Sequence, residues 1–284
     1  MLLAPGLSSY GFTYNNWGTN PGNAPGSIPT AGTSNAEGTF LQIASTSNIA
    51  QDCYWLAIKV MGGGINATQV DHLLDIGVDP AGGTAYSAVI SNIVCGASGT
   101  VTSQQTTPMF VFPIFIKAGS SVAARTQTQG SAANCRVVAK FWGQPSNPAA
   151  VPVGSFSETI GTITNSGGVS FTPGNAADGS WVDLGATTND MWWWQLCYQL
   201  SNGTITAERT YIDLAWGDAT NKVVIQRQMH AGLTTETVGD QMVSNLIFPN
   251  CYQPVPGGTH LYVRGRCENA PDSGYNAVAV GIGG

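Results

Sequence analysis

The sequence predicts an all-β protein built from two tandem antiparallel β-sandwiches of jelly-roll type, preceded by an extended N-terminal arm. Only 9% of the 284 residues are charged, whereas an average soluble domain carries roughly 25%. A helix-rich enzyme is therefore disfavoured, because its exposed helix faces need long charged side chains. The 43% of hydrophobic residues, together with 36 glycines and 15 prolines, instead favours short strands joined by tight turns.

Each half of the chain consists of short β-prone runs. Residues 40–43 alternate between apolar and polar side chains, which is typical of a strand with one buried face. Clusters of Gly, Asn and Pro separate the runs at hairpin-like spacing. The pattern fits a jelly roll and other Greek-key orders equally well. The expected strands are 40–43, 53–60, 72–78, 85–94, 110–116, 121–127 and 135–142 in the first half, and 192–200, 210–216, 222–229, 245–252, 261–267 and 276–281 in the second.

The second half of the chain repeats the first. Residues 38–44 resemble residues 179–185 at an offset of 141, and residues 74–77 match residues 212–215 at an offset of 138. Because the matching segments keep the same order, we predict an internal duplication with insertions and deletions in the loops. Three more first-half segments have matches at offsets of 136 to 140, namely 112–113, 119–125 and 135–139.

The N-terminal segment, residues 1–36, contains no charged residue and no histidine. Its prolines exclude a helix, and its aromatic residues distinguish it from a solvated leader. We expect an extended arm that lies either on its own domain or on a neighbouring subunit. The aromatic residues expected to make this partner contact are Tyr10, Phe12, Tyr14 and Trp17.

The domain boundaries follow from the repeat. The first sandwich is expected at residues 37–143, a Pro-rich linker at 144–155 and the second sandwich at 156–284. The prolines make the linker extended and semi-rigid, so we expect it to hold the two sandwiches at a defined spacing. The chain begins with neither a basic segment nor a sustained apolar run, so no secretory signal is expected.

The charge is distributed unevenly along the chain. Residues 37–147 carry five acidic and five basic side chains, whereas residues 148–284 carry eleven acidic and five basic ones, which gives the net charge of −6. This balance argues against nucleic acid and against an anionic membrane surface as partners. No apolar stretch reaches the roughly 20 residues that a membrane span needs. The six cysteines form no C-x-x-C pair, so buried thiols are favoured over disulfides.

No catalytic motif is present, so we expect no enzymatic activity, no metal and no cofactor. The sequence lacks the G-x-S-x-G, H-E-x-x-H and P-loop patterns. Asp75 and Asp213 occupy equivalent positions in the repeat, as do Arg125 and Arg264. Repeated aspartates allow a calcium site or an acid pair as one interpretation. We favour the other interpretation, a buried Asp–Arg ion pair in each sandwich.

A run of three tryptophans, Trp192, Trp193 and Trp194, is the most conspicuous local feature. On a strand, the first and third share one face and the second lies on the other. One interpretation is a carbohydrate-stacking platform. The alternative is a core strand with one tryptophan at an interface, and the matching Tyr54-Trp55 pair of the first half favours it.

Two segments of the first half carry a family resemblance. Residues 71–83 read DHLLDIGVDPAGG, and residues 112–125 read FPIFIKAGSSVAAR. They resemble virion proteins of tailed bacteriophages, which tend to carry such strands. The resemblance covers most of residues 37–143 and, more weakly, residues 171–281, where Ala215 replaces Gly77. It implies a structural component of a virus particle.

These observations together predict a non-enzymatic virion structural protein. The leading expectation is a capsid decoration, or cement, protein that bridges and stabilises capsomers in the virion after assembly in the host cytoplasm. Its expected partners are the major capsid protein or other virion proteins, together with homo-oligomeric contacts. The alternative is a tail, baseplate or fibre component that binds a host glycan or receptor.

Overall fold

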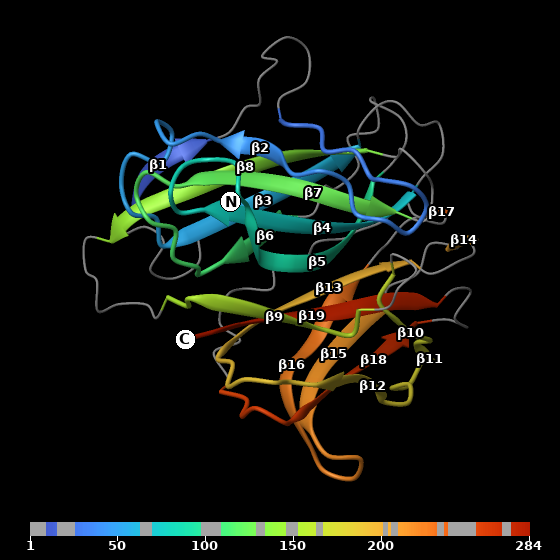
Figure 1. The fold of residues 1–284 in the computed structure, drawn as a ribbon. Helices are drawn as coiled ribbons and strands as arrows, with labels where there is room; N and C mark the ends of the chain where they lie inside the picture. Colours follow the sequence, from blue (N-terminus) through green and yellow to red (C-terminus); the bar gives the residue numbers. More distant parts are fainter. Residues whose placement is uncertain are drawn as a thin grey trace.

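All regular secondary structure in the described part of the chain is β-strand, which confirms the all-β prediction. Among these residues, no helix is long and apolar enough to cross a membrane. The computed structural model describes residues 10–15, 26–62, 70–97, 109–128, 134–145, 153–162, 167–200, 204–205, 210–231, 236–237, 254–268 and 274–284 (Figure 1).

The first sandwich has the strand order of a jelly roll. Its eight strands form two four-stranded sheets, ordered β1-β8-β3-β6 and β2-β7-β4-β5. This order results when two Greek keys are wound into a double sheet. The strands are β1 (Tyr10–Asn15), β2 (Leu41–Ala44), β3 (Trp55–Gly62), β4 (Val70–Asp79), β5 (Ser87–Ala97), β6 (Met109–Phe112), β7 (Ser121–Thr128) and β8 (Cys135–Pro145).

Strand β1 comes from the segment that the sequence assigns to a separate arm. It pairs antiparallel with β8 of its own chain and is therefore the first strand of the first jelly roll. For residues 10–15, the structure therefore matches the alternative in which the N-terminal segment lies on its own domain. This strand precedes residue 37, where the sequence predicts the first sandwich to begin. Backbone hydrogen bonding explains the difference, because β8 would otherwise expose an unpaired edge.

The second half repeats the same arrangement. In one sheet, β9 and β10 both pair with β19, which pairs with β13. The other is a five-stranded sheet of order β11-β18-β15-β16, in which β12 also pairs with β18. The predicted strand 245–252, which would match β6, lies outside the described residues. The strands are β9 (Phe156–Ile160), β10 (Val169–Phe171), β11 (Gly174–Asn175), β12 (Val182–Ala186), β13 (Trp193–Leu200), β15 (Thr210–Gly217), β16 (Lys222–Ala231), β18 (His260–Cys267) and β19 (Tyr275–Gly283), with a small ribbon of β14 (Thr204–Ile205) and β17 (Glu236–Thr237).

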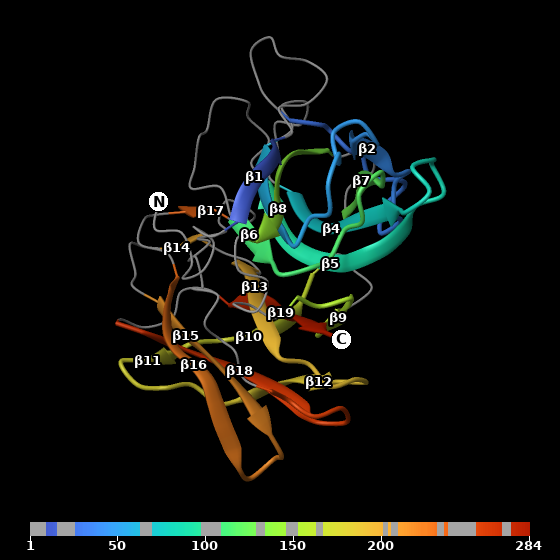
Figure 2. The same cartoon turned by 90° about the vertical axis from the view of Figure 1, so that its left-hand side faces the viewer.

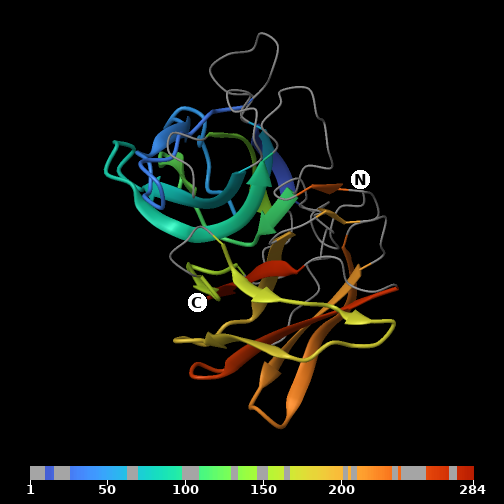
Figure 3. The same cartoon turned by 90° about the vertical axis from the view of Figure 1, so that its right-hand side faces the viewer.

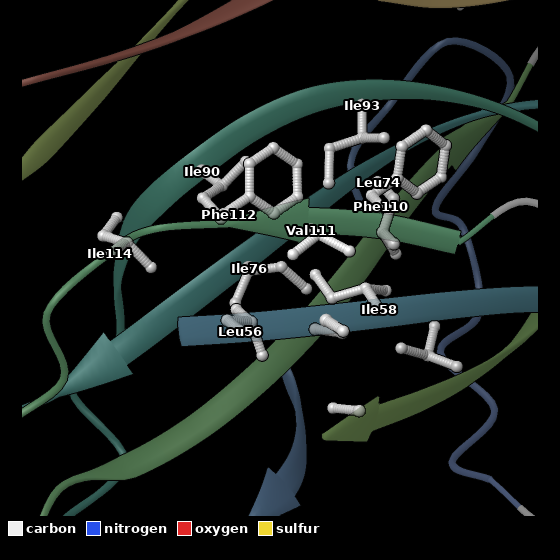
Figure 4. Packing of buried hydrophobic residues seen from close by; sticks show 14 of the residues in the cluster. Leu56, Ile58, Leu74, Ile76, Ile90, Ile93, Phe110, Val111, Phe112 and Ile114 are labelled. Atoms are coloured by element: carbon white, nitrogen blue, oxygen red, sulfur yellow. The ribbon is translucent and has the colours of Figure 1, made fainter. Parts of the chain in front are cut away.

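Alternating side chains fill the core of the first sandwich. Leu56 and Ile58 on β3 face Leu74 and Ile76 on β4, and β6 adds two phenylalanines (Figure 4). Each of these aliphatic side chains is fully buried, which contributes about 1.5–3 kcal/mol per side chain. The opposite faces of these strands are also covered, since Trp55 and Ala57 on β3 and Leu73 on β4 are at most 3% exposed.

The sheet that contains β13 and β19 is covered on both faces. Its side chains Trp194 and Leu196 pack into the core of the second half, whereas Trp193 and Cys197 pack into the core of the first. The views from either side agree that this sheet lies between the first sandwich and the sheet of β12, β18, β15 and β16 (Figures 2 and 3). The apolar core of the first sandwich therefore includes side chains of the second half, and we call it the shared core.

The contact between the halves is also polar. The hydroxyl of Ser157 on β9 donates to the carbonyl of Val89 at 2.6 Å, and Thr159 donates to the carbonyl of Ser91. These side chains satisfy carbonyl groups at the free edge of β5. At the end of the predicted linker, Gly154 donates its N–H to the carbonyl of Pro113 at 2.8 Å. The sandwiches thus touch directly and are not held apart by the linker.

Candidate functional site

Arg125 on β7 lies opposite Asp75 on β4 in the strand register. Leu74 and Ile76 point into the core, so Asp75 points to the outer face of the sheet. The guanidinium Nε of Arg125 donates to Oδ2 of Asp75 at 2.8 Å, and the N–H of Asn92 donates to Oδ1 at 2.7 Å. The aspartate is only 4% exposed, so the arginine compensates a buried charge.

The segment before β2 completes a cluster around this arginine. Glu37 pairs with Nη1 of Arg125 at 2.6 Å, and the guanidinium carbon lies 4.6 Å from the ring centre of Phe40. Phe40 in turn lies 5.6 Å from the ring of Tyr86. A Cβ atom at Gly77 would lie 2.7 Å from the Phe40 ring, so the glycine leaves room for the aromatic pair.

The second half carries the same cluster. Arg264 lies opposite Asp213 and donates to it at 2.8 Å through Nη2 and at 2.9 Å through Nε. Asp178 pairs with Arg264 at 2.6 Å, and Trp181 lies under the guanidinium at 4.3 Å. The structure therefore brings together both of the predicted Asp–Arg pairs.

Sequence reasoning missed the outer acid and the aromatic partner of each cluster. Glu37 and Asp178 are 141 residues apart, as are Phe40 and Trp181. The two aromatic residues lie within the repeated segments 38–44 and 179–185, and extending that comparison by one residue at its start would have paired the two acids. Side-chain alternation does not reveal these four residues, because they precede a strand, β2 or β12, and contact the arginine on the neighbouring strand, β7 or β18.

An open groove lies beside the first cluster. It encloses about 590 Å³, and its walls combine aromatic rings with short polar side chains. Arg125 brings one positive charge to this wall, and the two acids that pair with it, Asp75 and Glu37, lie behind and beside it outside the lining. The lining residues are Gly38, Thr39, Phe40, Gln42, Thr84, Ala85, Tyr86 and Arg125.

The three consecutive tryptophans are not an exposed platform. Trp193 is 3% exposed and Trp194 is 1% exposed, and Trp192 packs against the shared core. Trp193 meets Trp55 edge to face, with ring centres 5.3 Å apart. This arrangement corresponds to a core strand with one tryptophan at an interface, here the interface between the two halves. The buried rings of Trp193 and Trp194 cannot stack on a sugar, so the carbohydrate-platform interpretation does not fit these two residues.

Three of the four aromatic residues proposed to contact a partner lie within the described residues. Tyr10, Phe12 and Tyr14 are on β1, which pairs with β8. Trp17 lies outside the described residues. Contact of this segment with a neighbouring subunit stays a proposal.

Two other aspartates, Asp79 at the end of β4 and Asp218 just after β15, hold turns together. Asp79 accepts the N–H groups of Ala81 and Ala85, both at 2.9 Å. Asp218 accepts N–H groups from Asn221 and Thr220, and these hydrogen bonds lower the pKa of its carboxyl group. In the part of the chain that the structure describes, no group of three or more His, Cys, Asp or Glu residues is placed to hold a metal ion.

Burial holds His72 and the thiol of Cys135 in their neutral forms. Burial lowers the pKa of His72 to about 3, and its Nδ1 lies 2.9 Å from the hydroxyl of Thr126. Burial raises the pKa of the Cys135 thiol to about 12. The thiolate is the reactive form of cysteine, so this thiol is not activated. The exposed His260 lies 2.8 Å from Asp183.

Comparisons with known proteins find only distant likenesses. No protein-family model and no curated protein matches the sequence. Among solved structures, the enzyme PNGF-II is 10% identical with a TM-score of 0.36, and the match covers 96% of this chain but only 64% of that one. The viral STIV major capsid protein is 10% identical with a TM-score of 0.35, covering 90% of this chain and 96% of that one.

A third likeness is to the tandem CBM22-1-CBM22-2 domain of Paenibacillus barcinonensis Xyn10C. It is 12% identical with a TM-score of 0.28 and covers 96% of this chain and 98% of that one. The chain thus resembles, weakly, a viral capsid protein, an enzyme and a carbohydrate-binding tandem domain. TM-scores below 0.5 support no choice among them, so the functional argument rests on the residues of this chain.

Proposed function

We propose that this protein is a non-enzymatic structural component of a tailed-phage virion, and specifically a capsid decoration protein. The observation that carries the proposal is the shared apolar core, which joins two jelly rolls into one body through Trp55 and Trp193. A protein that bridges capsomers must transmit load between two contact surfaces. A packed interface does this, whereas a flexible linker between independent domains would not.

The composition supports the same proposal. With 9% charged residues, the chain has an unusually uncharged surface for its length. Such a surface suits permanent contact with neighbouring proteins, because charged residues are depleted at the cores of interfaces. Jelly rolls are used in viral capsid proteins and in lectins, which is an analogy at the level of the fold. The resemblance of residues 71–83 and 112–125 to phage virion proteins adds support from the sequence.

The proposed partners are the major capsid protein, other virion proteins and further copies of this chain. Each contact needs only a standard area of about 800 Å² per partner, because many copies act together on one particle. The proposed location is the assembled virion.

The test is to prepare particles with and without the protein and to measure the temperature at which capsids release their DNA. We expect particles to assemble without the protein, to rupture at a lower temperature, and to regain stability when purified protein is added. If particles that lack it rupture at the same temperature as complete ones, the decoration proposal is wrong.

The second candidate function is a tail, baseplate or fibre component that binds a host glycan. The groove beside Arg125 favours it, because aromatic and short polar side chains meet there on an exposed face. Binding of purified protein to host cells, together with its absence from isolated heads, would select this candidate over the first.

A further inference from the structure

We propose that the groove lined by Phe40, Tyr86 and Arg125 is a binding site for a neutral oligosaccharide. This inference rests on the second candidate function and deepens it by naming the site and the class of sugar; it does not depend on a capsid-decoration role. The groove encloses about 590 Å³, within the range of about 300–1,000 Å³ that small-molecule sites occupy.

The aromatic wall supplies the apolar contact. Phe40 and Tyr86 are half-buried, so part of each ring stays exposed while the rest is fixed by packing. Their planes are inclined by 52° with centres 5.6 Å apart, so they form an angled wall. The apolar C–H faces of a sugar ring pack against aromatic rings of this kind, and the ring π-system favours the positive edge of the C–H bonds.

The wall is organised before any ligand arrives. Arg125 is fixed by Asp75 at 2.8 Å and by Glu37 at 2.6 Å, and it holds Phe40 from one side. The Phe40 ring also contacts the backbone at Gly77, where a side chain would collide with it. A fixed wall loses little conformational entropy on binding, which favours weak ligands such as sugars.

The rim supplies the polar contacts. The side chains of Thr39, Gln42 and Thr84 are exposed at the groove. A threonine hydroxyl both donates and accepts, and a glutamine amide does the same through its two ends. Sugar hydroxyl groups also have both capacities, so they are matched by these side chains.

The charge of the groove selects against acidic sugars. One arginine faces two carboxylates, which leaves a net charge of −1 in the cluster if all three groups are ionised. The guanidinium already binds both acids through Nε and Nη1, so a carboxylate or sulfate of the ligand would meet a cluster whose positive charge is compensated. Neutral glycans are therefore the class that fits.

The second half differs at the positions that form the rim. Gln42 corresponds to Asp183, which is held by His260 at 2.8 Å, and Thr39 corresponds to Ser180. Ala215 replaces Gly77 beneath the aromatic ring. We therefore assign the sugar site to the first half and use the second half as an internal control.

The experiment titrates the purified full-length protein with neutral oligosaccharides built from glucose, galactose, mannose or N-acetylglucosamine, and with sialylated counterparts, and follows binding by NMR and calorimetry. We expect millimolar or tighter binding of at least one neutral oligosaccharide. Tyr86→Ala should weaken that binding at least tenfold and Gln42→Ala severalfold, while Ser180→Ala leaves it unchanged. Circular dichroism of each variant establishes that it is folded.

Three results would overturn the proposal. They are the absence of binding to every neutral oligosaccharide in the panel, a preference for the sialylated forms, and wild-type affinity in folded Tyr86→Ala and Gln42→Ala proteins. Because Gln42 is an exposed side chain, its variant remains informative even if loss of Tyr86 impairs folding. Loss of sugar binding leaves the capsid-stability measurement unaffected, so the two proposals fail separately.

Discussion

Each of the two equivalent arginines is held by one buried and one exposed acid, and these two acids differ in what they contribute to stability. The side chain of Asp75 is 5% exposed, whereas that of Glu37 is 44% exposed. A charged hydrogen bond to a buried acid contributes about 1.5–3 kcal/mol, whereas exposed ion pairs contribute about 0–1 kcal/mol. The buried acid therefore anchors the cluster, and the exposed acid mainly orients the arginine.

The first prediction compares these acids by substitution. Asp75→Asn and Asp213→Asn should each lower the free energy of unfolding by about 1.5–3 kcal/mol, because an amide N–H₂ or a neutral oxygen replaces the charge facing the arginine. Glu37→Gln, the matched control, should cost about 0–1 kcal/mol. Urea titrations followed by tryptophan fluorescence measure all three. An equal cost for Glu37→Gln and Asp75→Asn would contradict this account of the cluster.

The second prediction concerns His72, which is buried and neutral. The unfolded chain takes up a proton near pH 6.5, whereas the folded protein does not until about pH 3. The free energy of unfolding should therefore fall as the pH drops below 6.5, by at most about 1.4 kcal/mol per pH unit for this group. His72→Asn should reduce this slope between pH 6 and pH 4 and leave the pH dependence above pH 7 unchanged. Identical slopes in both proteins would show that His72 does not contribute to the pH dependence of the free energy of unfolding.

At the level of elements, the same turn precedes β7 in the first half and β18 in the second. Gly119 and Gly258 have φ angles of +77° and +80°, and a Cβ atom at either position would meet nothing within 4 Å. Backbone strain alone therefore decides which residues fit. The matched conformations support the duplication independently of the strand order.

The third prediction follows from this turn. Gly119→Ala and Gly258→Ala should each cost about 1–2 kcal/mol, because an alanine at positive φ is strained. Gly119→Asn should cost less, since asparagine enters this conformation more readily. Thermal unfolding of the three variants measures their relative stabilities. A Gly119→Asn protein no more stable than Gly119→Ala would exclude backbone strain as the cause.

The sequence predicts the repeated elements better than their long-range pairing. Alternation of side chains and collinear repeats are enough to predict an all-β fold, a duplication and the two Asp–Arg pairs. Strand β1 was missed as part of the sandwich because its partner β8 lies more than a hundred residues away, and no local pattern reports such a pairing. The groove was missed for a similar reason, since Phe40 and Tyr86 precede β2 and β5 and meet only once these strands lie in one sheet.

At the scale of the whole molecule, two jelly rolls behave as one packed unit in this structure. Independent domains usually move relative to each other unless their interface is large and apolar. Here β13 and β19 place side chains in both cores, so the second half completes the core of the first. We therefore expect the two halves to unfold together.

The fourth prediction tests this coupling through Trp193. Trp193→Ala removes the contact with Trp55 and should cost about 3–5 kcal/mol, as large-to-small changes of buried aromatics do. It should also split a single calorimetric unfolding transition into two. Val223→Ala, at a side chain that is 48% exposed, serves as the control and should change little. Two transitions already present in the unmodified protein would contradict a shared core.

The number and position of copies in the virion test the proposed function most directly. Quantitative mass spectrometry of purified particles, combined with imaging of particles that carry a labelled form of the protein, gives both. The account predicts on the order of hundreds of copies per particle, distributed over the capsid surface, because decoration acts through many repeated contacts. Tens of copies or fewer, confined to the tail, or absence from the particle, would contradict it.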